Sequence, residues 1–161
     1  MTSLRVHELS LETLDTLAGV DTLCLFVAED ERPLSGAAGL SDWRLCGQLS
    51  RLLVDGFFTG AADDSVLLPS NGRMAPGRIV VFGLGRQERL SDGPALGARL
   101  AAAASVLDKA GATSVALEVP GAGRLEDSER ARALTAGFLP GFHGRHLAVL
   151  GDKALAHLLG G

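Results

Sequence analysis

Two glycines that directly follow an apolar run are the first residues of this sequence whose types and spacing could bind a charged ligand. The run covers residues 79–82, and Gly83, Gly85 and Arg86 come next. Backbone N–H groups of a glycine turn can bind a phosphate, and Arg86 would add positive charge. Only a GxG pattern is present, and the next helix is expected several residues later. We therefore favour a structural turn here, with phosphate binding as the alternative.

Histidines and carboxylates form two short clusters that could hold a metal ion or transfer a proton. His143 and His146 are close in sequence, but no third ligand lies near them, which favours solvated histidines. Asp63 and Asp64 have no neighbouring base or nucleophile and are interpreted as turn residues. The sequence therefore predicts no catalytic residue, no metal ligand and no cofactor.

Composition excludes several classes of protein. The chain has 161 residues, 47% of them hydrophobic, which suits a single domain over residues 1–161. Its net charge is −4, without a basic block, so nucleic-acid binding is not expected. No apolar run is long enough to span a bilayer, and the start lacks the apolar core of a signal peptide. We expect a cytoplasmic protein that binds neither nucleic acid nor membranes.

The cysteine count argues against a disulfide scaffold. Only Cys24 and Cys46 are present. In a reducing compartment, both are expected to be small buried hydrophobic residues rather than a disulfide pair.

The spacing of apolar residues predicts strands that alternate with helices. Strands are expected over residues 4–9, 22–27, 65–68, 79–82, 114–119 and 146–151. Helices are expected after Ser10, from Ser41 or Asp42 to Val54, over 95–110, from Asp127 or Ser128 to Phe138, and over 152–159, with a loop over 35–39. This alternation predicts a three-layer α/β fold whose mixed, mostly parallel sheet of about six strands lies between helices. Strands 65–68 and 79–82 are expected to pair as an antiparallel hairpin.

Aromatic residues gather around the amphipathic helix that ends at Val54. Trp43 lies at its start and is expected to pack on the edge of the core, while Phe57 and Phe58 follow its end. Together these three side chains could leave a partly exposed apolar patch, and such a patch marks a partner surface. They are our candidate interface residues.

The order of these motifs resembles that of a known family. The succession LSGAAGLSDWRLCGQLSRLLVDGFFTGAADDSVLLP, followed by RIVVFGLGRQERL and an Ala-rich helix, is similar to the amino-terminal domain of the leucyl aminopeptidases, the cytosol aminopeptidase family. The resemblance is clearest over residues 23–110. It implies a macro-domain-like fold, which in the family precedes a separate catalytic domain with two metal ions. The family's metal-binding signature NTDAEGR does not occur here, so the resemblance implies a non-catalytic domain, alone or from a longer protein.

The resemblance implies two alternative functions. The family domain contributes to oligomers, so our first prediction is an assembly module that contacts copies of itself or a partner protein, possibly a separate aminopeptidase catalytic chain. Macro domains cradle the diphosphate of ADP-ribose in a glycine-rich loop, and Gly36 and Gly39 lie at a similar point of this sequence. The alternative is therefore a nucleotide or ADP-ribose-type ligand bound by this loop or by residues 83–85. Glu29 and Asp30, in place of the asparagine-rich segment of macro domains, would repel a phosphate.

Overall fold

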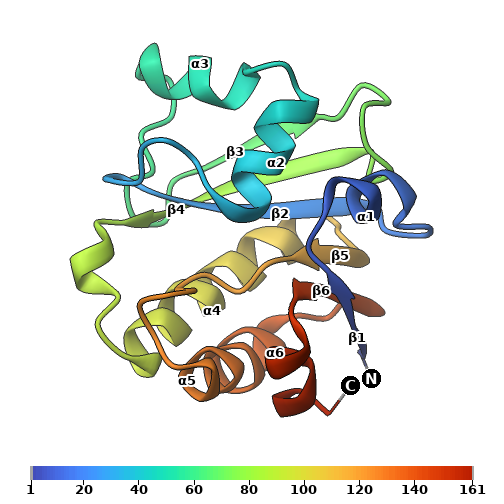
Figure 1. The fold of residues 1–161 in the computed structure, drawn as a ribbon, viewed down its shortest axis with the longest axis vertical. Helices are drawn as coiled ribbons and strands as arrows, with labels where there is room; N and C mark the ends of the chain where they lie inside the picture. Colours follow the sequence, from blue (N-terminus) through green and yellow to red (C-terminus); the bar gives the residue numbers. More distant parts are fainter. Residues whose placement is uncertain (1, 161) are drawn as a thin grey trace.

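A twisted sheet forms the centre of the computed structural model, which describes residues 2–160 (Figure 1). Within those residues the sheet has six strands in the order β1-β6-β5-β2-β4-β3. All neighbouring strands are parallel except β3 and β4, which form the predicted antiparallel hairpin. The strands are β1 (Ser3–Glu8), β2 (Thr22–Ala28), β3 (Ser65–Pro69), β4 (Arg78–Gly85), β5 (Ser114–Leu117) and β6 (His146–Gly151).

Helices cover both faces of the sheet, which confirms the predicted three-layer α/β fold (Figure 1). One face carries α1 (Leu11–Thr16), α2 (Gly36–Arg44) and α3 (Gln48–Val54). The opposite face carries α4 (Gly93–Lys109), α5 (Asp127–Arg132) and α6 (Lys153–Leu158). A 3-10 turn η1 (Gln87–Arg89) precedes α4, while a π-helical segment η2 (Ala133–Phe138) and a 3-10 turn η3 (Leu139–Gly141) continue α5.

Strand β2 is buried along its whole length, as its unbroken apolar sequence predicts. Leu23 and Leu25 face the α1–α3 side, and Cys24 and Phe26 face the α4–α6 side. The two apolar clusters therefore meet at the central strands of the sheet.

Three helices begin at capping hydrogen bonds, and the first of these confirms the helix predicted after Ser10. The Ser10 hydroxyl accepts from the Thr13 amide (3.1 Å), and Asp92 Oδ1 accepts from the Ala95 amide (2.8 Å). Asp152 Oδ1 accepts from the Leu155 amide in the same way (3.0 Å). These side chains satisfy amide groups that have no partner inside the helix.

The predicted loop over 35–39 and the single helix from residue 42 to Val54 are wrong. Residues 36–39 form the first turn of α2, and the chain breaks between α2 and α3 at Cys46 (φ 55°) and Gly47 (φ 82°). Asp42 does not cap the helix that contains it. Its Oδ1 accepts from the Leu49 amide (2.9 Å), so it caps α3 instead.

Three further boundaries differ from the sequence prediction. Strand β4 continues through Gly85 because Ala28 of β2 still pairs with it there. Strand β5 ends at Leu117, and α5 begins after Glu126, which makes no capping bond through its side chain.

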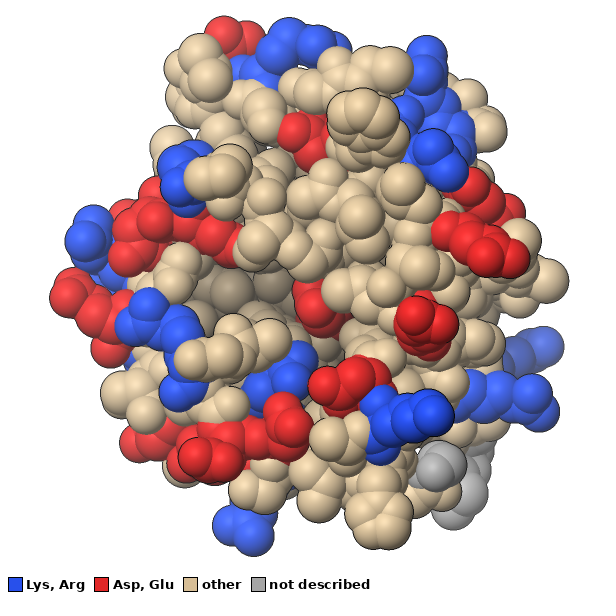
Figure 2. Space-filling view, in the orientation of Figure 1, with Lys and Arg blue, Asp and Glu red and all other residues tan. Residues whose placement is uncertain are grey.

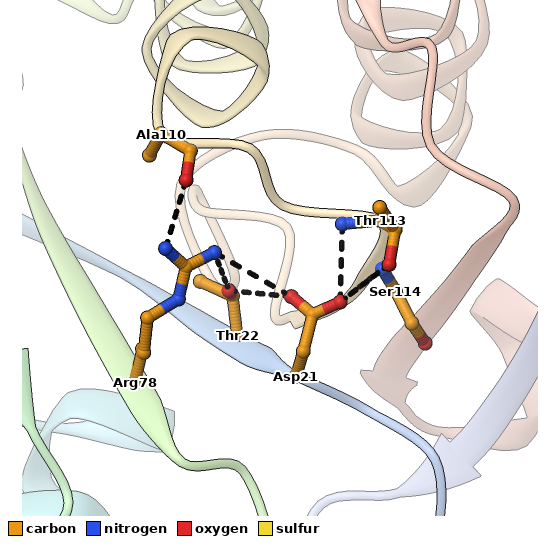
Figure 3. A network of polar contacts seen from close by, with 6 residues as sticks. All are labelled: Asp21, Thr22, Arg78, Ala110, Thr113 and Ser114. Atoms are coloured by element: carbon orange, nitrogen blue, oxygen red, sulfur yellow. Dashed lines mark hydrogen bonds and ion pairs between the residues drawn. The ribbon is translucent and has the colours of Figure 1, made fainter.

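Asp21 joins the starts of three neighbouring strands (Figure 3). Its Oδ2 accepts from the amides of Thr113 (3.1 Å) and Ser114 (2.9 Å), just before and at the start of β5. Its Oδ1 accepts from the Thr22 hydroxyl (2.7 Å) in β2 and lies 3.8 Å from Arg78 Nη2 in β4. Burial acts to raise the pKa of Asp21, but the hydrogen bonds from these partners outweigh it and lower the pKa below its ordinary value.

We expect Asp21→Ala to lower the free energy of unfolding by about 2 kcal/mol near neutral pH, because it leaves the Thr113 and Ser114 amides without their acceptor. Since the folded pKa is depressed, this stabilisation is present above the unfolded pKa and is lost as pH falls through the folded pKa. The difference between wild type and variant, measured by urea denaturation, should therefore shrink in acid. An equal difference at neutral and acidic pH would contradict this account.

Helix α4 and segment η2 touch backbone to backbone at a pair of glycines. A Cβ added at Gly137 would lie 2.6 Å from the Gly97 carbonyl oxygen, whereas a Cβ at Gly97 would lie 3.9 Å from its nearest neighbours. The contact is therefore asymmetric: only Gly137 requires the absence of a side chain.

Gly137→Ala is expected to destabilise the chain by about 1–3 kcal/mol. The new methyl group would meet the backbone of Gly97, which cannot move aside as a flexible side chain could. Gly97→Ala is the matched control and should leave stability unchanged or raise it by about 0.5–1 kcal/mol, as alanine does inside a helix. Thermal unfolding of the two variants checks this. Equal effects would show that the helices do not depend on this contact.

Candidate functional site

The cavity of interest lies beyond the carboxyl ends of β2, β4 and β5. After β2 the chain crosses to α2 on one face, and after β4 and β5 it crosses to α4 and α5 on the other face. Parallel sheets open a crevice where such connections diverge. This cavity has a volume of about 250 Å³. Its walls are apolar side chains, the start of α2 and the loops after β4 and β5; the polar side chains among its lining residues are Glu31, Ser35, Gln87 and Glu118.

Glu118, directly after β5, directs its carboxylate to the start of α2. Its Oε1 accepts from the Ala37 amide at 3.0 Å. Gly36 has a φ of +57°, and a Cβ there would overlap the same carboxylate oxygen. Glycine at this position therefore permits both the backbone conformation and the close approach of the carboxylate.

The surroundings of Glu118 disfavour its charged form. Burial raises the pKa of this carboxyl; the Ala37 hydrogen bond and the Arg130 charge lower it less, and the nearby Glu31 raises it further. Arg130 is only 5% exposed, and it donates to the carbonyl of Val119 (2.6 Å). The net result is a pKa above the usual range for glutamate.

The rim of the cavity is acidic as well. Glu31 Oε2 accepts from the Ser35 hydroxyl (2.5 Å), and Asp30 Oδ1 accepts from the Gln87 amide (3.0 Å). This hydrogen bond is the main reason that the pKa of Asp30 is lowered. Figure 2 shows a hollow left of centre with both acidic and basic side chains on its border. The carboxyl groups of Asp30, Glu31 and Glu118 thus gather at the cavity, with the guanidinium groups of Arg86, Arg124 and Arg130 close to them.

The cavity contains one of the five predicted ligand-binding residues. Gly36 lines it, and Gly39 packs inside α2, where a Cβ would lie 2.8 Å from the Leu34 carbonyl oxygen. Gly83 is a buried strand residue against the backbone of Ala61, and Gly85 ends β4 with a φ of 76°. Arg86 is paired with Glu88 (3.2 Å). Residues 83–85 are the last residues of β4 rather than the tight turn that we favoured, because they still pair with β2.

Sequence reasoning missed Glu31 and Glu118 as site residues. Glu118 did carry a signal, since it is a lone acidic residue in an otherwise apolar run. Glu31 lies in a stretch of acidic and turn residues, and nothing in the sequence distinguishes it from Glu29.

The predicted histidine and acidic clusters are dispersed among other partners. His143 Nδ1 lies 2.5 Å from Asp108 Oδ2, and His146 Nδ1 lies 2.8 Å from the Ser3 hydroxyl. Asp63 is paired with Arg99. Between residues 2 and 160, no group of three His, Cys, Asp or Glu side chains is placed to hold a metal ion.

The two cysteines differ, which corrects the expectation that both are buried. Cys24 is fully buried in β2, and burial raises the pKa of its thiol, so it is protonated at neutral pH. Cys46 is exposed at the break between α2 and α3.

Of the three predicted interface residues, one is buried and two are exposed. Phe58 is 5% exposed and belongs to the core. Trp43 is 72% exposed rather than packed on the core edge, and Phe57 is 73% exposed. Val54, at the end of α3, is a further exposed apolar side chain that the sequence prediction did not include.

Comparison with known proteins decides the family. Residues 24–144 match the model of the cytosol aminopeptidase family, N-terminal domain. The chain belongs to this family. The match extends beyond the 23–110 stretch on which the resemblance was clearest. None of the curated proteins compared with the chain matches it.

Solved structures show the same fold at low sequence identity. A mutant of tomato leucine aminopeptidase superimposes with a TM-score of 0.67 at 19% identity, covering 99% of this chain and 35% of the tomato chain. The macrodomain of Mycobacterium tuberculosis DarG gives 0.69 at 16% identity, covering 94% of this chain and 100% of that one. A macrodomain mutant from Oceanobacillus iheyensis gives 0.69 at 11%, covering 98% and 88%. The chain thus spans about a third of the tomato enzyme and has a macrodomain-like fold.

The helices were compared with the length and hydropathy that a membrane span requires. Within residues 2–160, none is long and apolar enough to cross a bilayer.

We expect Glu118→Gln to be more stable relative to wild type at neutral pH than in acid. The pKa of Glu118 is higher in the folded chain than in the unfolded chain. Wild type therefore has its full stability below the unfolded pKa and loses part of it as pH rises through the folded pKa. Glutamine keeps an oxygen for the Ala37 amide and carries no charge, so it avoids this loss. Urea denaturation between about pH 4 and pH 8 measures the difference.

Glu8→Gln is the matched control, because Glu8 is exposed at the end of β1. It should show a much smaller pH-dependent difference from wild type. If Glu118→Gln and wild type kept parallel pH profiles, the buried carboxyl would not be titrating as described.

Proposed function

We propose that this chain is a non-catalytic assembly module that associates with copies of itself. The observation that carries the proposal is the exposure of three large apolar side chains: Trp43 on α2, Val54 at the end of α3, and Phe57 in the segment that follows α3. Large exposed apolar surfaces mark contact sites in soluble proteins. Tryptophan is also among the residues that contribute most to binding energy at interfaces.

Two further points support a role other than catalysis. The family match concerns an N-terminal domain. Among the described residues that line the cavity, the Ser35 hydroxyl is paired with the Glu31 carboxylate, but no third side chain hydrogen-bonds to that carboxylate to orient it as in a catalytic triad. We place the module in the cytoplasm, where its partner could also be a separate aminopeptidase catalytic chain.

Ligand binding in the cavity is the second candidate function. It is favoured by the position of Gly36 in the cavity wall and by the macrodomain-like fold. A nucleotide or ADP-ribose-type ligand would have to tolerate the carboxylates of Glu31 and Glu118. A ligand at 100 times its dissociation constant would add about 2.7 kcal/mol to stability, which a melting-temperature shift would detect.

The test of self-association is the solution mass by light scattering over a concentration series. Wild type should reach a multiple of 16.6 kDa. The double variant Trp43→Ala, Phe57→Ala should remain a monomer with an unchanged melting temperature, because interface aromatics each contribute about 2 kcal/mol, or roughly thirtyfold in the dissociation constant.

Leu158→Ala is the matched control, since Leu158 is exposed on α6 at the opposite face. It should associate like wild type. A wild type that stays monomeric at every concentration would contradict self-association, and the same mass for the double variant would exclude these two residues from the interface.

A further inference from the structure

The start of α2 is already occupied by a carboxyl group, which is supplied by the chain itself. Helix α2 has nine residues, and its first amides point away from the helix without an intrahelical partner. Such an end attracts negative charge and is a common binding place for phosphate groups. Here the Glu118 carboxylate accepts from the Ala37 amide at 3.0 Å.

We propose that Glu118 is a specificity-determining residue that excludes phosphate-bearing ligands from the cavity by occupying the anion position at the start of α2. This inference goes beyond the proposed assembly function, does not depend on it, and argues against the second candidate function, phosphate-ligand binding in the cavity.

The carboxylate is built into this position rather than resting there by chance. Glu118 follows strand β5 directly, so its backbone is fixed by the sheet. The buried guanidinium of Arg130 holds the loop behind it through the Val119 and Pro120 carbonyls (2.6 and 3.3 Å). On the other side, Gly36 leaves room that any larger residue would fill.

A second carboxylate strengthens the exclusion. Glu31 is held by the Ser35 hydroxyl (2.5 Å), and Ser35 is the residue that precedes α2. Its charge is close enough to Glu118 to raise the pKa of that carboxyl. A phosphate at the start of α2 would therefore meet a carboxyl group from two directions, Glu118 after β5 and Glu31 before α2.

Replacement of Glu118 should consequently expose the anion position. Glu118→Ala frees the Ala37 amide, removes one charge and opens space within the cavity of about 250 Å³. Glu118→Gln removes the charge alone, since its amide oxygen still occupies the position.

The experiment is a calorimetric titration of each protein with pyrophosphate and with ADP-ribose at neutral pH. We expect Glu118→Ala to bind at least one of the two probes at least tenfold more tightly than wild type, with Glu118→Gln between them. Glu8→Ala, which loses the same charge at the exposed end of β1, should bind like wild type.

Two results would overturn the proposal. One is wild type binding both probes as tightly as Glu118→Ala does; the other is folded Glu118→Ala binding neither probe more tightly than Glu8→Ala. If Glu118→Ala does not fold, the double variant Glu31→Gln, Glu118→Gln removes both charges at nearly constant volume. It should then show the tenfold gain, and a failure to gain would equally overturn the proposal. Light scattering on the same proteins reports self-association separately.

Discussion

The carboxylate of Asp21 is the contact on which the arrangement of the central sheet most depends. It binds the starts of β2 and β5 directly and reaches Arg78 at the start of β4. Parallel strands that begin in a fixed register also end in one, so the loops that follow them are brought to the same place. The polar network at the starts of the strands thus helps to set the geometry of the cavity beyond their carboxyl ends.

The chain shares its fold with macrodomains, but the charged side chains of its cavity come from loops. The chain superimposes on macrodomains with TM-scores near 0.69, yet identity to them is only 11–16%. The residues that set the field of this cavity, Glu31 and Glu118, are contributed by two loops and are not dictated by the order of strands. The fold therefore does not determine which side chains line this cavity, as in other widely used folds.

The sequence predicted those features that depend on neighbouring residues. Apolar runs located all the strands, and the capping side chains of Ser10 and Asp92 marked helix starts, because each acts within one turn of chain. It failed where a distant contact decides. Asp42 caps the following helix after a sharp break at Gly47, and Glu118 meets a helix that begins 82 residues before it in the sequence, at Gly36. No local pattern encodes either contact.

The glycine contact between α4 and η2 bears on how motion is distributed through the chain. With no side chain between the two backbones at Gly97 and Gly137, neither helix can slide without displacing the other. Helix α4 and segment η2 should therefore move together. On the other face of the sheet, α2 and α3 are short helices separated by a break at Cys46 and Gly47. Changes in the width of the cavity would then come mainly from its α2 wall, because the strands that line it, β2 and β4, belong to the centre of the sheet.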